Sequence, residues 1–217
     1  MRIIKNTSPI MLAIWTLLLL AGLVAFGLTR WSLAFVCFAT LGLSLVPPIL
    51  ASRWALTLPV PFLFATTLFF FGSIFMGEAF GFYERLWWWD LVLHGSSAVG
   101  FGLTGFLFVF MLFEGDRLAA PPSAIAFITF CVAMTVGATW EIFEYSMDTL
   151  FGLNMQKSGL DDTMEDLAIN ALGGVISSAT GYLYLVRKST GPLSRRLAEF
   201  IDLNRRFYQK SKDRWKK

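Results

Sequence analysis

Three short polar motifs lie inside apolar segments of the sequence and carry the side chains that could do chemistry. The first pairs Asp90 with His94, which is the only histidine in the chain. The second is WEIFEYSMD at 140–148, and the third is DDTMEDLAIN at 161–170. Residues three or four apart share one face of a helix. Each motif therefore predicts a helical face that carries polar groups.

Several carboxylates beside one imidazole suit a divalent cation such as Mg²⁺, Mn²⁺, Fe²⁺ or Zn²⁺. We expect four side chains to bind this metal: His94, Glu141, Glu144 and Asp166. We expect three others to act beside it as general base, as support for the ligands or in orienting a substrate: Asp90, Asp162 and Asn170. The bound cation would polarise an oxygen or activate water.

The three motifs concentrate negative charge. They hold eight carboxylates, those of Asp90, Glu141, Glu144, Asp148, Asp161, Asp162, Glu165 and Asp166. The adjoining segments offer only Arg85 and Lys157 as counter-charges. Carboxylates held this close must be protonated, hydrated or neutralised by cations. A second interpretation stays open for the start of the third motif, where Asp161 or Asp162 would cap a helix and Glu165 would complete a capping box.

The elements that position these motifs are membrane-spanning helices. The chain is 56% hydrophobic and 15% charged, whereas soluble domains carry about 25% charged residues. Apolar runs of 18 or more residues are typical of membrane spans. Six are expected, at 9–28, 32–51, 57–77, 91–113, 123–146 and 166–186. We therefore predict an all-α polytopic membrane protein, with a six-helix transmembrane domain at 1–190 and a cytoplasmic basic amphipathic tail at 191–217.

Small features refine this prediction. Cys37 and Cys131 lie inside apolar runs and are expected to be buried thiols rather than a disulfide or a metal pair. Pro47 and Pro48 should kink the second span or end its regular part. The tryptophans at 87–89 are typical of an aromatic belt at the membrane surface.

The distribution of positive charge predicts the orientation. Lysine and arginine favour the cytoplasmic side of a membrane. With six spans, one side receives Arg2, Lys5, Arg53, Arg117 and the basic tail, whereas the other receives only Arg30, Arg85 and Lys157. Both termini are therefore expected in the cytoplasm. This bias also accounts for the basic tail without nucleic acid, so the predicted partner is the lipid bilayer.

The same orientation brings the three motifs to the outer ends of spans four, five and six. Small residues continue each polar face toward the other side of the membrane: Ala98, Gly102 and Gly105 in span four, Ala133, Gly137 and Ala138 in span five, and Gly173, Gly174, Ser177 and Gly181 in span six. Small faces let membrane helices approach closely. We therefore expect these three spans to pack together and to share one polar cluster.

The motifs also resemble a known family. WWWDLVLHGSSAVGFG, WEIFEYSMD and DDTMEDLAINALGG look like the YjdF-like family of bacterial inner-membrane proteins, and more loosely like the VanZ-like family. The resemblance covers about residues 85–185. It rests on Asp90 with His94, on Glu141, and on Asp166 with Asn170 and Gly173. It implies a multi-pass protein of the bacterial plasma membrane, and its looser part implies a role in the cell envelope.

Three functional interpretations remain. The first is a metal-dependent enzyme that acts on a lipid, a lipid-linked phosphate or a small envelope metabolite. The second is a transporter for a cation or a proton-coupled solute, because intramembrane carboxylates also mark ion paths. The third is a structural membrane protein whose acids only stabilise the fold. The substrate, the metal and the oligomeric state are not determined by the sequence.

Overall fold

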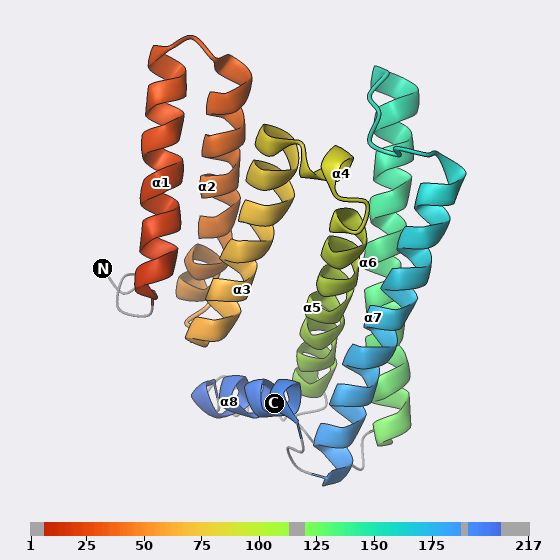
Figure 1. Ribbon diagram of the computed structural model, residues 1–217. Helices are drawn as coiled ribbons and strands as arrows, with labels where there is room; N and C mark the ends of the chain where they lie inside the picture. Colours follow the sequence, from red (N-terminus) through yellow and green to blue (C-terminus); the bar gives the residue numbers. More distant parts are fainter. Residues whose placement is uncertain (1–6, 113–119, 188–190, 205–217) are drawn as a thin grey trace. The chain divides into compact units, whose positions relative to one another are not determined.

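The computed structural model describes residues 7–112, 120–187 and 191–204 (Figure 1). Within these ranges all regular structure is helical, and six segments are long and apolar enough to cross a membrane. They are α1 (Pro9–Gly27), α2 (Trp31–Arg53), α3 with its π-helical continuation η2 (Val60–Phe70 and Phe71–Ala79), α5 (Trp89–Leu112), α6 (Pro122–Phe151) and α7 (Leu160–Arg187). The predicted all-helical membrane fold is therefore confirmed.

Two helices are longer than hydropathy predicts. We expected the fifth span to end near residue 146 and the sixth to begin near residue 166. Instead, α6 continues to Phe151 and α7 begins at Leu160. Gly152, with a φ of 66°, ends α6 in the left-handed conformation that glycine adopts without strain. A span predicted from hydropathy ends where charged residues begin, whereas the helical backbone hydrogen bonds continue through those residues.

The helices form two compact units. Within the described residues, the first unit contains α1, α2, α3, η2, the short α4 (Phe82–Arg85) and residues 202–204. The second contains α5 from Asp90 onward, α6, α7, and α8 (Pro192–Leu203) as far as Ile201. All three polar motifs therefore belong to the second unit.

The first unit is packed by apolar side chains. Leu18, Cys37 and Phe75 form its buried cluster. Both cysteines of the chain are free thiols, as expected, but only Cys37 is buried, whereas Cys131 is partly exposed. The α2 helix does not end at Pro47 and Pro48, since it continues to Arg53. In the same unit, the Asn204 side chain accepts from the Thr57 N–H at 2.7 Å and donates to the Thr57 carbonyl at 2.8 Å.

The second unit is packed by small residues. A Cβ atom on Gly173 of α7 would lie 2.7 Å from the Ala98 Cβ and 2.8 Å from the Gly95 carbonyl oxygen of α5. A Cβ on Gly105 of α5 would lie 2.7 Å from Val132 of α6. The predicted close packing of these three helices is therefore confirmed, and Figure 1 shows them side by side.

The α8 helix begins the predicted amphipathic tail. Its Leu197 is 3% exposed and packs in the cluster that also contains Phe106, Ile125 and Leu185, whereas Arg195 and Arg196 are exposed. Several predictions fall outside the described residues: those on Arg2, Lys5 and Arg117, and those on the tail from Arg205 onward.

Candidate functional site

The polar ends of α5, α6 and α7 bring six buried or partly buried side chains together. We call this group the polar cluster: Asp90, His94, Glu141, Glu144, Asp166 and Asn170. Each helix contributes two of them at a spacing of three or four residues, so that both side chains lie on its inward face. All six residues belong to the second unit.

The burial of this cluster is unusual for ionisable groups. Glu141 is 4% exposed, Asp166 2% and His94 7%. Asn170 is 1% exposed. The side chain of Asp90 is 25% exposed and gives the cluster one open side. Acidic groups at such depth in a membrane helix are costly, and they are usually paired or functional.

His94 lies at the centre of the cluster. Its Nε2 atom is 3.5 Å from Asp90 Oδ1 and 3.7 Å from Asp166 Oδ2. Its Nδ1 atom is 3.6 Å from Glu141 Oε1 and 3.5 Å from Asn170 Nδ2. The two ring nitrogens therefore face different partners, with two aspartates on one edge of the ring and α6 and α7 groups on the other.

The spacing around Nε2 fits a metal better than it fits direct hydrogen bonds. An N–H···O hydrogen bond spans about 2.7–3.2 Å, and both aspartate oxygens lie beyond that range. Ligand atoms arranged tetrahedrally at about 2.1 Å from one ion are about 3.4 Å apart. One ligand atom each from Asp90, His94 and Asp166 all lie within 4.8 Å of one another. These three residues can therefore share one cation.

Several oxygens of the cluster lack a hydrogen-bond partner within the described part of the chain. They are both carboxylate oxygens of Glu141, Asp166 Oδ2 and Asn170 Oδ1. The Thr163 hydroxyl accepts from the Gln156 side chain, and its own O–H is a further polar neighbour of Glu141. More than nine in ten buried polar groups are normally hydrogen-bonded. Buried carboxylates in this state must be protonated, hydrated or neutralised by a cation.

Close backbone packing fixes where these side chains lie. The Asn170 side chain occupies the space that a Cβ atom on Gly137 would fill. One turn further along α7, Gly173 lets α5 approach, and α5 carries His94. The glycines therefore set the separation of the helices that present the polar cluster.

The remaining predicted site residues have other surroundings. Glu144 is buried but accepts from the Trp140 indole N–H at 2.9 Å, one helical turn away. Asp162 is partly exposed and accepts from the Lys157 backbone N–H at 3.1 Å. Neither belongs to the group of three that could share one ion. Asp161 and Glu165, which we left open between site and cap, are exposed.

Asp148 has a structural role that the sequence analysis did not predict. Its two oxygens accept from the backbone N–H groups of Met155 and Gln156, at 2.7 and 2.8 Å. These bonds hold the loop between α6 and α7. Asp148 thus positions the start of α7 without joining the polar cluster.

The tryptophans before the first motif divide between two environments. Trp87 is 83% exposed and Trp88 40% exposed, as expected for an interfacial belt. Trp89 packs edge-on against Phe82, with ring centroids 5.0 Å apart. The belt interpretation therefore fits Trp87 and Trp88 best.

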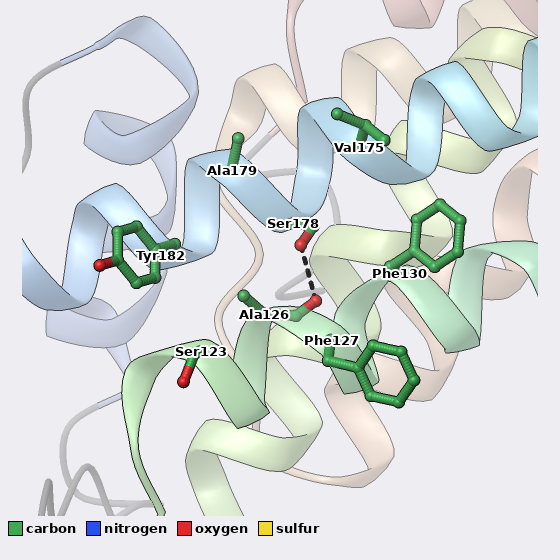
Figure 2. A pocket seen from close by; sticks show the side chains of 8 residues that line it. All are labelled: Ser123, Ala126, Phe127, Phe130, Val175, Ser178, Ala179 and Tyr182. Atoms are coloured by element: carbon green, nitrogen blue, oxygen red, sulfur yellow. Dashed lines mark hydrogen bonds between the residues drawn. The ribbon is translucent and has the colours of Figure 1, made fainter.

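A separate groove lies between α6 and α7 at their other ends (Figure 2). It is open, has a volume of about 420 Å³ and is lined by Ser123, Ala126, Phe127, Phe130, Val175, Ser178, Ala179 and Tyr182. Its α6 residues are separated from Glu141 by at least 11 positions, or about 16 Å of helix, whereas on α7 Val175 lies five positions from Asn170. None of them is charged, so the groove offers no counterpart to the chemistry of the polar cluster.

From the sequence we expected Asp90 to act beside the metal and Asp166 to bind it. In the structure, the distance from His94 Nε2 to the nearest oxygen is 3.5 Å for Asp90 and 3.7 Å for Asp166, so both aspartates are about equally close. The spacing of Asp90 and His94 by one helical turn is the signal for this closeness. Sequence reasoning did not identify Trp140 as the partner of Glu144, although these two residues are also one turn apart.

Comparisons with known proteins place this architecture in a family. A family model described as "Predicted membrane protein (DUF2238)" matches residues 10–187, which is most of the chain. An uncharacterized protein of Thermotoga maritima is 31% identical over 130 residues, which is 58% of this chain and 64% of that protein. The match thus spans less than two thirds of that relative. No solved structure matches the chain. The looser VanZ-like resemblance finds no support among these matches.

Proposed function

This chain belongs to the DUF2238 family of predicted membrane proteins, and from that premise we propose that it binds one divalent transition-metal ion through Asp90, His94 and Asp166. The observation that carries the proposal is the grouping of one ligand atom from each of these residues within 4.8 Å. The buried, unpartnered oxygen of Asp166 supports it independently. An imidazole with two carboxylates suits Mn²⁺, Fe²⁺ or Zn²⁺ better than Mg²⁺.

We further propose that the metal serves hydrolytic or related chemistry on a lipid or envelope substrate. Three protein ligands leave positions for water and substrate, as in catalytic metal sites. Asp90 is the most exposed ligand and marks the open side. Bound water would become a nucleophile. Asp162, partly exposed at the start of α7, is the candidate base, and Asn170 would orient a ligand or the substrate.

Transport has less support from the geometry. The residues of α5, α6 and α7 beyond the polar cluster, at 97–112, 122–138 and 171–186, carry no charge. Close contacts between Gly102 and Ser177 and between Gly181 and Phe106 fill the interface there. A polar route for an ion is therefore not built into this part of the three helices. A purely structural use of the acids is also disfavoured, because unpartnered carboxylates destabilise a buried site.

We infer from the family resemblance that the protein lies in the bacterial plasma membrane, and from the charge distribution that both termini are in the cytoplasm. The polar cluster would then open toward the outer face. Single cysteines introduced at Lys157 and at Arg53 test this orientation by labelling with a membrane-impermeant reagent in intact cells. Labelling at residue 157 but not at residue 53 is expected. The reverse pattern would contradict the orientation.

The metal proposal is tested by elemental analysis of the detergent-purified protein. The wild type, dialysed and then reloaded with Zn²⁺, Mn²⁺ or Fe²⁺, is expected to retain one ion per chain, whereas His94→Ala and Asp90→Asn retain none. Asp90 is partly exposed, so that its variant should fold even if His94→Ala does not. A wild-type protein without metal, or variants that keep a full complement, would refute the proposal.

A further inference from the structure

The two nitrogens of the His94 ring face two distinct sets of groups. Nε2 faces the oxygens of Asp90 and Asp166, which complete the proposed metal site. Nδ1 faces Glu141 Oε1 at 3.6 Å and the Asn170 side-chain nitrogen at 3.5 Å. Glu141 comes from α6, whereas the two aspartates come from α5 and α7. Glu141 is therefore on the far side of the imidazole from the proposed ion.

Glu141 is an unusual group to bury in this place. It is 4% exposed, and neither of its oxygens has a hydrogen-bond partner among the residues that the structure describes. The ring nitrogen that faces Glu141 is His94 Nδ1, which lies 3.6 Å from Oε1 and so beyond ordinary hydrogen-bond range, and the Thr163 hydroxyl is a second polar neighbour of Glu141.

Metal binding would determine where the imidazole proton sits. A neutral imidazole carries one N–H donor and one lone pair. If the ion takes the lone pair of Nε2, the proton must be on Nδ1 and needs an acceptor. Metal-bound histidines almost always donate this second N–H to a carboxylate, a carbonyl or water. Glu141 is the carboxylate placed to accept it.

We propose that Glu141 is a positioning residue that holds His94 with its proton on Nδ1 and its Nε2 lone pair toward the metal. This inference rests on the proposed metal site. It assigns Glu141 to the support of a ligand rather than to the metal itself, which differs from the expectation drawn from the sequence. Asn170 can assist, because a half-turn of its amide presents Oδ1, which lacks a partner among the described residues, to the same Nδ1 atom.

The single histidine of the chain makes the inference directly measurable. Protein labelled with ¹⁵N-histidine gives the two ring-nitrogen signals of His94 alone. In the Zn²⁺-loaded wild type we expect the Nδ1-protonated form. Glu141→Gln and Glu141→Ala should keep one Zn²⁺ per chain at saturation but bind it about 10-fold and about 100-fold more weakly. The Nδ1–H signal should shift in both variants, because the charged acceptor has gone.

A matched control is available on α7. Glu165 is exposed and lies next to Asp166 without joining the polar cluster. Glu165→Gln makes the same chemical change and should leave both the affinity and the ring-nitrogen signals as in the wild type. It separates a local effect on His94 from a general loss of negative charge at this end of the protein.

The possible outcomes separate this inference from the metal proposal. If the wild type takes up no Zn²⁺, both the proposed metal site and this inference are wrong. If the wild type binds Zn²⁺ but Glu141→Gln abolishes binding even at saturation, Glu141 is a ligand and the positioning role is wrong. Unchanged affinity and unchanged Nδ1 signals in the Glu141 variants would overturn it as well.

Discussion

At the polar end of α5, α6 and α7, buried oxygens of Glu141, Asp166 and Asn170 lack hydrogen-bond partners among the described residues. At the apolar end of the same helices, buried hydroxyls are satisfied. The Thr129 hydroxyl donates to the Ile125 carbonyl at 2.8 Å, and the Ser177 hydroxyl donates to the Gly174 carbonyl at 2.9 Å. The same three helices therefore leave buried polar atoms without hydrogen-bond partners at one end and give them partners at the other.

This difference separates polar residues that build the fold from polar residues for which we propose a ligand. Hydroxyls that bond their own helix backbone leave no acceptor open, so they are compatible with a closely packed membrane interface. Buried carboxylates without partners reduce stability unless they are protonated, hydrated or joined by a cation. The apolar end thus supplies the stability that the polar end does not, and changes at the two ends should have different consequences.

The largest effect is expected from breaking the close packing that supports the polar cluster. Gly173→Leu forces a side chain against the Ala98 Cβ and the Gly95 carbonyl, and backbone atoms cannot move aside. We expect a loss of about 3 kcal/mol or more in the free energy of unfolding, together with loss of Zn²⁺ binding. Reversible unfolding of the detergent-solubilised protein, followed by circular dichroism, measures the first effect.

Gly100→Leu is the matched control for this change. Gly100 lies on the same helix as the contacts of Gly173, and a Cβ atom there has nothing within 4 Å. Its substitution should leave both stability and metal binding close to the wild type. Equal losses in the two variants would show that leucine disturbs α5 and α7 generally, and that the close approach at Gly173 is not the cause.

An intermediate effect of opposite sign is expected at the polar end. Asp166→Asn removes a buried carboxyl group that lies near the carboxyl groups of Asp90 and Glu141, and should stabilise the metal-free protein by about 1 kcal/mol. The wild type should gain about 2.7 kcal/mol when free Zn²⁺ is 100 times the dissociation constant, whereas the variant gains nothing. Thermal unfolding with EDTA and with Zn²⁺ measures both terms.

Asp161→Asn provides the control, because Asp161 is exposed on the same helix. It should keep the stabilisation by Zn²⁺. Destabilisation of the metal-free protein by Asp166→Asn would indicate that this carboxylate supports the fold, and would favour the structural interpretation of the acids.

The sequence predicts the packing of α5, α6 and α7 in more detail than it predicts the contacts within the polar cluster. Hydropathy locates six spans, and the run of Gly173, Gly174 and Ser177 predicts the packed face of α7, because both depend on side-chain type at helical spacing. The convergence of the three motifs follows from the number of spans. These features need no knowledge of how each helix is rotated about its axis.

The identity of the atoms that face His94 does depend on that rotation. Spacing alone makes Glu141 and Glu144 equivalent, since both lie on the inward face of α6. In the structure, Glu141 faces the imidazole, whereas Glu144 binds the Trp140 indole. The rotation is set by contacts such as that of Gly137 with Asn170. Each such contact depends on two helices, so the sequence of one helix alone does not predict it. The part played by Asp148 depends in the same way on the backbone path of a loop.

The smallest effect is expected from removing one satisfied hydroxyl at the apolar end. Ser178 donates to the Ala126 carbonyl at 2.7 Å and so joins α7 to α6 beside the groove of Figure 2. Hydrogen bonds between membrane helices contribute about 0.6 kcal/mol on average. Ser178→Ala should cost about that much in stability and leave Zn²⁺ affinity unchanged. Ser52→Ala, which removes a bond within α2 alone, should cost less. A clear loss of Zn²⁺ affinity in Ser178→Ala would mean that the two ends are coupled through α7, and that packing at one end tunes the ligands at the other.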